Sequence, residues 1–259
     1  MKKKLGILGI AVACAGIAGA DIVYYNDFSN PVTAAAGVTA TTNAAGSVSS
    51  GAFTTTTGNG MLMINMSALD LESDANLSSI KITINGATQP SGGAWTAIGF
   101  RSNTDAFANG AGDAVYTRLG GNSQLAVFDA PKSANADAIA TNRLTWAGMT
   151  HASAGFPDVG GFNTSLTSGN DYTLEFLFDV ISNTSTVTLT WNGGANSGTV
   201  SWANTNAVPL DYVLLQLNAT NAKVYDIKVE AEMVPEPATL GLFLLAGIGS
   251  LFFRRVTKK

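Results

Sequence analysis

The stretch that decides the fold reads Tyr172-Thr-Leu-Glu-Phe-Leu-Phe-Asp-Val180 and continues, after a short loop, as Thr186-Val-Thr-Leu-Thr-Trp191-Asn192. Apolar and polar side chains alternate along both segments, a period of two that is typical of half-buried antiparallel strands. The polar loop between them, Ile181 to Ser185, is short enough to join the two strands as a hairpin. The stretch therefore predicts a β-hairpin with one apolar face, and Trp191 on that face belongs to the core.

The same alternation extends along the rest of the chain. Further strands are predicted at Met61 to Met66, Ser79 to Asn85, Trp95 to Arg101, Val115 to Leu119, Gln124 to Asp129, Tyr212 to Leu217 and Lys223 to Glu230. The segment from Pro31 to Gly60 has few large apolar residues and predicts only short strands and loops. Because no segment between Asp21 and Val234 shows sustained helical spacing, the many strands indicate a sandwich or barrel, and the length favours a jelly roll.

One part of this pattern points to a known kind of fold. The hairpin and the closing strand Val224-Tyr-Asp-Ile-Lys-Val-Glu230 resemble the second half of a concanavalin A-like or laminin-G-like sandwich. The resemblance implies an all-β fold, an antiparallel β-sandwich of the jelly-roll, concanavalin A-like kind. We expect this domain to span residues 21–234, with a signal peptide before it and a C-terminal transmembrane helix after it.

Residues 1–20 have the three parts of a secretory signal peptide. Lys2 to Lys4 form its basic start, Leu5 to Ile17 its apolar run, and Ala18-Gly19-Ala20 a small-x-small cleavage site. We expect the export machinery and signal peptidase to release a mature chain that begins at Asp21. An uncleaved anchor is one alternative, although the run is short for it. A lipoprotein modified at Cys14 is another, although no leucine stands three positions before that cysteine.

The other end of the chain, residues 235–259, also has three parts. Pro235-Glu236-Pro237 is followed by an uncharged stretch from Ala238 to Phe253 and then by the pair Arg254-Arg255. As a helix the uncharged stretch would be roughly 24 Å long, shorter than the hydrocarbon core of about 30 Å, and the basic end would stay in the cytoplasm. The stretch is therefore marginal as a permanent anchor and adequate as a transient one.

These three parts resemble the PEP-CTERM sorting tail of proteins exported by exopolysaccharide-producing Gram-negative bacteria. The resemblance implies that an exosortase, a membrane transpeptidase, recognises the tail and removes it. It predicts a secreted or cell-surface protein that is held in the membrane only before processing. The alternative is a plain C-terminal anchor helix.

The charge of the domain excludes one class of partner. Between Asp21 and Val234 there are seven Lys or Arg and seventeen Asp or Glu, a net charge of −10 that the basic chain ends conceal. Nucleic acid and anionic lipid surfaces would repel such a domain. The only cysteine, Cys14, lies in the leader, so the chain cannot form an internal disulfide.

No arrangement of residues predicts catalysis. The run Asp70-Leu-Glu-Ser-Asp-Ala-Asn-Leu77 comes closest to the Glu-x-Asp-x-x-Glu pattern of some glycosidases with this kind of sandwich, but Leu77 stands where the second glutamate is needed. His151, the only histidine, has no nucleophile motif beside it. We therefore expect a protein without enzymatic activity.

Two sets of carboxylates are candidates for structural calcium, the one cofactor that the sequence suggests. The first is the alternating set Asp70, Glu72 and Asp74, for which a solvated acidic loop is the simpler interpretation. The second is implied by the sandwich resemblance. It joins Asp27 of the first strand to Asp226 of the last, because the terminal strands of such sandwiches often pair.

The sequence leaves three hypotheses about the function of the protein. The two processing signals, without a catalytic arrangement, favour a non-catalytic protein of the cell surface or extracellular matrix. The alternative is a carbohydrate-binding module that recognises exopolysaccharide, with Trp146 and Trp202, near predicted loops, as the candidates for stacking on sugar rings. A glycan-active enzyme of unrecognised class is the third hypothesis.

Overall fold

The computed structural model describes residues 20–87, 95–104, 107, 114–120, 124–130, 143–147, 171–191, 194, 196–204, 207–218, 220 and 222–234. Within the strands, the side chains of residues 95, 114, 116, 118, 120, 124–130, 143–147 and 196 lie outside this description.

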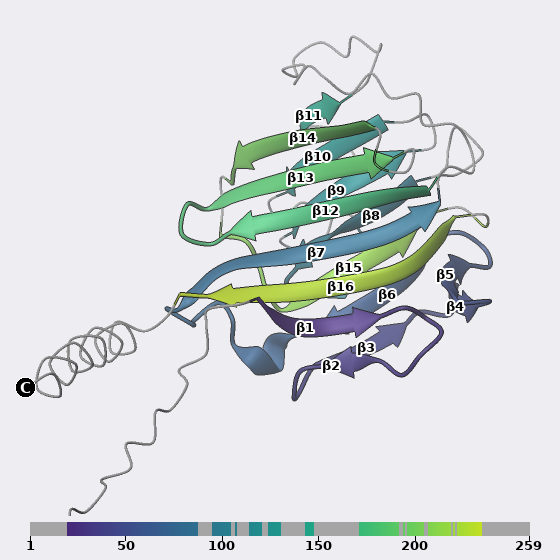
Figure 1. Ribbon diagram of the computed structural model, residues 1–259, viewed down its shortest axis with the longest axis horizontal. Coiled ribbons are helices and arrows are strands. Elements are labelled where there is room, and N and C mark those ends of the chain that lie inside the picture. The colour runs from purple at the N-terminus through teal and green to yellow at the C-terminus, as the bar shows by residue number, and fades with distance from the viewer. Residues whose placement is uncertain are drawn as a thin grey trace, which may run out of the picture.

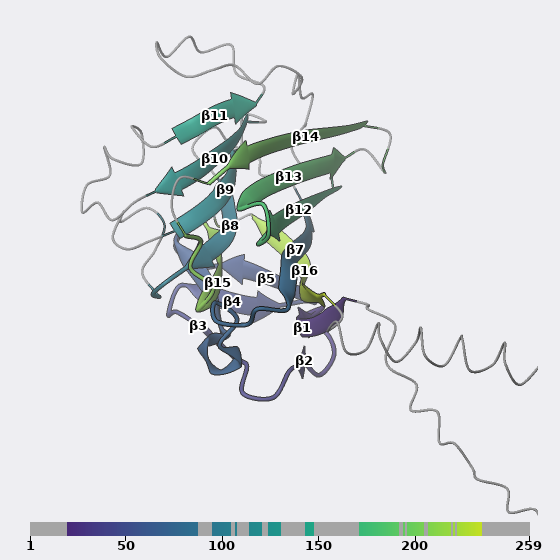
Figure 2. The same cartoon turned by 90° about the vertical axis from the view of Figure 1, so that its left-hand side faces the viewer.

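The described residues form two antiparallel sheets that lie face to face (Figure 2). Sheet A contains β1 (Asp21–Asn26), β2 (Thr33–Ala34), β4 (Gly46–Ser49), β5 (Ala52–Thr55), β7 (Leu77–Ala87), β12 (Asp171–Asp179), β13 (Thr184–Trp191), β14 (Asn196–Ala203) and β16 (Lys223–Met233). Sheet B contains β3 (Thr39–Thr42), β6 (Gly60–Asn65), β8 (Trp95–Arg101), β9 (Ala114–Gly120), β10 (Gln124–Ala130), β11 (Arg143–Ala147) and β15 (Tyr212–Leu217). The order in sheet A is β14-β13-β12-β7-β16-β1-β2, with β5 on β16 and β4 on β5, and the order in sheet B is β11-β10-β9-β8-β15-β6-β3.

The core fills the space between the sheets because alternate residues of each strand face inward. Ile80, Ile82 and Ile84 of β7 are fully buried, while the residues between them are half-exposed. Phe176 of β12 meets Phe100 of β8 across the two sheets, with ring centroids 5.4 Å apart. Each fully buried side chain of this size stabilises the fold by about 1.5–3 kcal/mol.

The structure confirms the predicted hairpin and the antiparallel sandwich. β12 and β13 pair along their whole length, from Tyr172 opposite Trp191 to Asp179 opposite Thr184. The bounds of β8 and β15 are those predicted, and the other predicted strands are found within a few residues of their predicted ends. Two strands were not predicted, β11 and β14, and β14 extends the hairpin by pairing with β13.

One prediction about the first strand is wrong. Asp27 does not lie in it, because β1 ends at Asn26 and the backbone turns at Phe28, whose φ is +57°. The Asp27 carboxylate instead accepts hydrogen bonds from the backbone N–H groups of Ser29 (3.0 Å) and Asn30 (2.8 Å). Aspartate commonly ends a strand in this way, since its side chain satisfies the N–H groups of the turn that follows.

The two ends of the domain lie side by side at one end of the strands of sheet A. Asp21 at the start of β1 lies opposite Ala231 near the end of β16. In Figure 1 β1 begins and β16 ends at the left, whereas the end of β7 and the start of β16 lie at the right.

No helix in the described part of the chain is long and apolar enough to cross a membrane. A 3-10 turn is formed at Ser67–Leu69. The processing signals Ala18, Pro235, Glu236, Pro237, Arg254 and Arg255 lie outside the described residues, as does His151.

Candidate functional site

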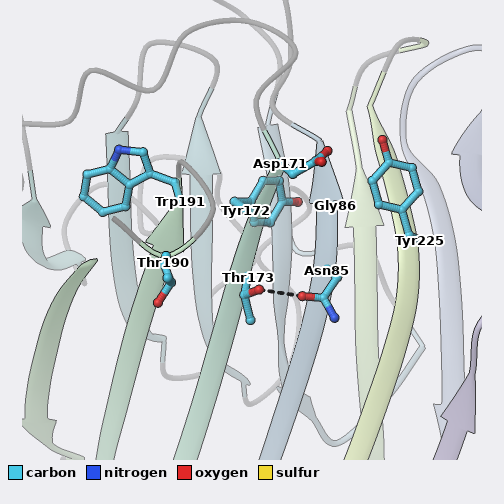
Figure 3. A pocket seen from close by; sticks show the side chains of 9 residues that line it. Asn85, Gly86, Asp171, Tyr172, Thr173, Thr190, Trp191 and Tyr225 are labelled. Carbon is cyan, nitrogen blue, oxygen red and sulfur yellow. Dashed lines mark hydrogen bonds between the residues drawn. The ribbon is translucent and has the colours of Figure 1, made fainter. Parts of the chain in front are cut away.

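A row of polar side chains crosses the outer face of sheet A. Thr190 of β13, Thr173 of β12, Asn85 of β7 and Asp226 of β16 are in register on four neighbouring strands. The Thr173 hydroxyl donates to Asn85 Oδ1 (2.5 Å), and Asn85 Nδ2 donates to both carboxylate oxygens of Asp226 (2.8 and 3.1 Å). These hydrogen bonds hold the Asn85 amide in one orientation, and Figure 3 shows the bond from Thr173.

A β-bulge lifts one aromatic side chain beside this row. Val224 pairs with Gly86 and Asp226 pairs with Asn85, so Tyr225 is the extra residue on β16. Tyr225 is 37% exposed, and its hydroxyl lies near enough to the carboxylate of Asp171, at the start of β12, to feel its charge. Burial, followed by the charge of Asp171, raises the pKa of Tyr225, so the hydroxyl stays protonated at neutral pH. Bulges redirect side chains in this way and are frequent next to binding sites.

Behind the row, Tyr172 lies over a glycine. A Cβ added at Gly86 would stand 2.5 Å from the carbonyl oxygen of Lys223 and 2.8 Å from the Tyr172 hydroxyl, so only glycine leaves room for the ring. Tyr172 is 3% exposed, and burial raises its pKa to about 12. Thr96 lies near enough to offset part of this rise, but the Tyr172 hydroxyl has no partner with hydrogen-bond geometry among the described residues.

These residues line a pocket of about 340 Å³ at the end of sheet A. Its lining residues are Asn85, Gly86, Asp171, Tyr172, Thr173, Thr190, Trp191, Gly194 and Tyr225. In Figure 3 Trp191 and Tyr225 stand on opposite sides of Tyr172 and Gly86. The described lining residues thus combine aromatic rings with an amide, hydroxyls and the carboxylate of Asp171.

The sequence-predicted pair Asp27 and Asp226 is brought together. Burial raises the pKa of Asp226, the hydrogen bond from Asn85 opposes the rise, and the charge of Asp27 adds to it. Hydrogen bonds from Asn30 and from backbone N–H groups keep the pKa of Asp27 below its ordinary value. Among the described residues no three His, Cys, Asp or Glu side chains gather to hold a metal ion, so calcium between these two carboxylates stays a prediction.

The Asp226→Asn substitution is expected to raise the thermal midpoint at neutral pH. A carboxyl whose pKa is raised by folding favours the folded state only while it is protonated, and ionisation removes that stability as the pH rises through the folded-state pKa. Asparagine keeps an acceptor for Asn85 without the charge. The gain should vanish below the ordinary pKa of an aspartate, which thermal melts from pH 3 to pH 8 can check. Equal destabilisation at every pH would contradict this account.

The acidic set Asp70, Glu72 and Asp74 has a structural role in the loop that contains it. A Glu72 carboxylate oxygen accepts a hydrogen bond from the Leu210 backbone N–H (2.8 Å), and Asp74 accepts one from the N–H of Asn76 (2.9 Å). Asp70 ends the 3-10 turn with a left-handed backbone, φ +49°. Two of the three carboxylates thus hold the chain in place, and the three do not form a group that could hold a metal.

Of the two candidate tryptophans, the structure describes the side chain of Trp202, and it is not a lining residue of the pocket. Trp202 of β14 packs against the core and stacks on Phe176, with centroids 5.9 Å apart and an interplanar angle of 24°. Phe176 therefore covers one face of the indole ring. Trp146 belongs to β11, where its backbone pairs with Ala126, and its side chain lies outside the described residues.

Sequence reasoning missed Asn85, Asp171 and Tyr225 as site residues. A signal for the last was present in β16. Buried positions there recur every second residue from Ile227 to Ala231, but Val224 and Ile227 are three apart. A step of three in a period-two pattern indicates a bulge. It marks Tyr225 as a side chain displaced from the regular alternation.

No protein family model matches the chain, and no curated protein matches it. Solved structures do. The chain is similar to a seed lectin from Lotus tetragonolobus, with a TM-score of 0.51 and 11% identity, over 84% of this chain and 100% of that one. It is similar to lectin II from Ulex europaeus, with a TM-score of 0.50 and 7% identity, over 82% and 99%.

A third similar structure is a protein of unknown function from Shewanella oneidensis MR-1, with a TM-score of 0.50 and 14% identity, over 84% of this chain and 89% of that one. At such identities the likeness shows the fold alone. The domain is an all-β antiparallel sandwich of the legume-lectin, concanavalin A-like kind.

Proposed function

We propose that this domain binds carbohydrate, without catalysis, in the pocket beside Tyr225. Sugars are recognised by aromatic rings that cover their C–H faces and by planar polar groups that hydrogen-bond their hydroxyls. The observation that carries the proposal is the bulge. It holds a partly exposed Tyr225 next to the exposed Asp171 carboxylate, at the end of a row of polar side chains that already has a fixed orientation. The lectin-like fold of the chain is consistent with this role.

The wider role that we propose is in the cell envelope or extracellular matrix of a Gram-negative bacterium, with exopolysaccharide as the ligand. The support comes from the predicted leader and sorting tail, which would deliver the domain to the place where such polymers are found. The acidic net charge of the domain argues against nucleic acid as the partner.

The Tyr225→Ala substitution is expected to weaken oligosaccharide binding about tenfold, since the ring contact and the apolar area it covers are worth about 1.4 kcal/mol. Calorimetric titration of the exported protein with oligosaccharides from the producing organism's own polysaccharide measures the effect. Tyr25→Ala, on β1 of the same sheet and outside the pocket, is the matched control and should leave the affinity unchanged. A wild-type protein that binds none of these sugars would instead support a purely structural role.

Processing is tested separately. Mass spectrometry of the protein recovered from the native organism is expected to show a chain that begins at Asp21 and lacks Arg254-Arg255. The measurement gives both cleavage points and any group added at the new C-terminus. A recovered chain with the basic tail intact would contradict removal by an exosortase.

A further inference from the structure

The charges around the pocket have one dominant sign. Asp171 lines it, and Asp226 lies one strand beyond Asn85, close enough to Asp27 that their charges interact. None of the described lining residues is basic. A uronic acid or another anionic sugar would therefore enter against like charge.

The basic residues on the outer face of sheet A do not make the charge around the pocket positive. Lys81 and Lys228 both pair with Glu230, at 3.2 and 2.7 Å, farther along β7 and β16. Lys223 lies opposite Ala87 at the rim and is not a lining residue. It supplies one positive charge against the three carboxylates Asp171, Asp226 and Asp27.

The pocket also offers the groups that recognise an ammonium ion. A cation is attracted to the face of a tyrosine ring and to a neighbouring carboxylate, and Tyr225 and Asp171 present both together. The Asp171 carboxylate near the Tyr225 hydroxyl is exposed and can accept hydrogen bonds. The Tyr172 side chain lines the same pocket, and its buried hydroxyl has no partner with hydrogen-bond geometry among the described residues. An ammonium group has three donors for the carboxylate and the other oxygen atoms of such a pocket.

We infer that the pocket selects amine-bearing glycans, that is, chains with free amino sugars, over their N-acetylated or acidic counterparts. The inference rests on the proposed carbohydrate binding and names the class of sugar bound. Asp171 is the specificity-determining residue, because it faces the ligand directly, while Asp226 and Asp27 contribute through the field around it.

The test is calorimetric titration of the exported protein with three hexasaccharides, of glucosamine, N-acetylglucosamine and galacturonic acid, at low ionic strength and pH 6. The glucosamine hexamer is expected to bind at least about tenfold more tightly than the acetylated one. The difference should shrink as salt is added, and the acidic hexamer should bind least. Asp171→Asn should abolish the preference, because it should weaken binding of the glucosamine hexamer about tenfold more than binding of the acetylated one.

A polycation could also be attracted by the acidic surface as a whole, so the control removes the same charge from a neighbouring position. Glu175→Gln lies on β12, like Asp171, but outside the pocket lining, and should keep the preference. If both variants weaken glucosamine binding equally, general electrostatic attraction explains the result and the inference fails. If the acetylated hexamer binds as tightly as glucosamine and Tyr225→Ala weakens both, carbohydrate binding stands and the amine preference falls. If no hexamer binds, both proposals fail.

Discussion

The Phe176→Ala substitution is expected to lower the free energy of unfolding by about 3–5 kcal/mol, the usual cost of removing a buried phenylalanine ring. Phe176 is fully buried in β12 and contacts both sheets. Its ring lies 5.4 Å from that of Phe100 in sheet B and 5.9 Å from that of Trp202 in sheet A. The resulting cavity would have strand backbones on two sides, which limits how far the core can close over it.

Urea unfolding monitored by tryptophan fluorescence measures this change. Leu177→Ala is the matched control, because Leu177 is the next residue of the same strand and points to the half-exposed outer face. It should cost far less than Phe176→Ala. Equal losses from the two substitutions would show that the alternation of inward and outward residues in β12 does not set the stability of the sandwich.

The Gly86→Ala substitution is expected to lower the free energy of unfolding by about 1–3 kcal/mol, the range for overpacking a buried position. The new methyl group would stand 2.5 Å from the carbonyl oxygen of Lys223, which belongs to the backbone of a paired strand and cannot rotate away. It would also meet the Tyr172 hydroxyl at 2.8 Å and push that ring toward the pocket. The same substitution should therefore weaken glycan binding.

The control for this prediction is Thr83→Ala, three residues earlier on β7 and on its half-exposed face. Its effect should stay within about 0.5 kcal/mol. Thermal melts and titrations of both variants check the prediction. An unchanged stability for Gly86→Ala would mean that β16 shifts to admit a methyl group, and that the glycine is not required for the position of Tyr172.

The sequence predicts the sheets best where side-chain alternation is strong. β7, β12 and β13 have large apolar residues at every second position, so their faces and pairing could be inferred before the structure. β14 has no such pattern. Among its described side chains Val200 is buried, Gly198 and Trp202 are half-buried, and the strand is held to β13 by backbone pairing.

The pocket could not be predicted because it is made by register between distant segments. Asn85, Asp171 and Tyr225 each look like an ordinary exposed residue of a strand or its end. They become neighbours only because β12 pairs with β7 at Asp171 opposite Ala87, and β16 pairs with β7 around the bulge. The proximity of Asp27 and Asp226 could be expected for the opposite reason, since pairing of the first and last strands follows from the sandwich resemblance. For Trp202, position in an irregular segment does not reveal which way the side chain points.

Because β1 begins beside the end of β16, both ends of the domain's chain leave it at the same end of sheet A. Asp21 and Ala231 lie side by side, whereas Tyr225 lies eight residues before the last residue of β16, Met233. At about 3.3 Å per residue, roughly 25 Å of strand separate the pocket from the end of β16. A membrane, a polymer or a fused protein joined to either end of the domain's chain would lie at that end of the strands. The pocket would then lie at the opposite end, accessible to long chains in the surrounding medium.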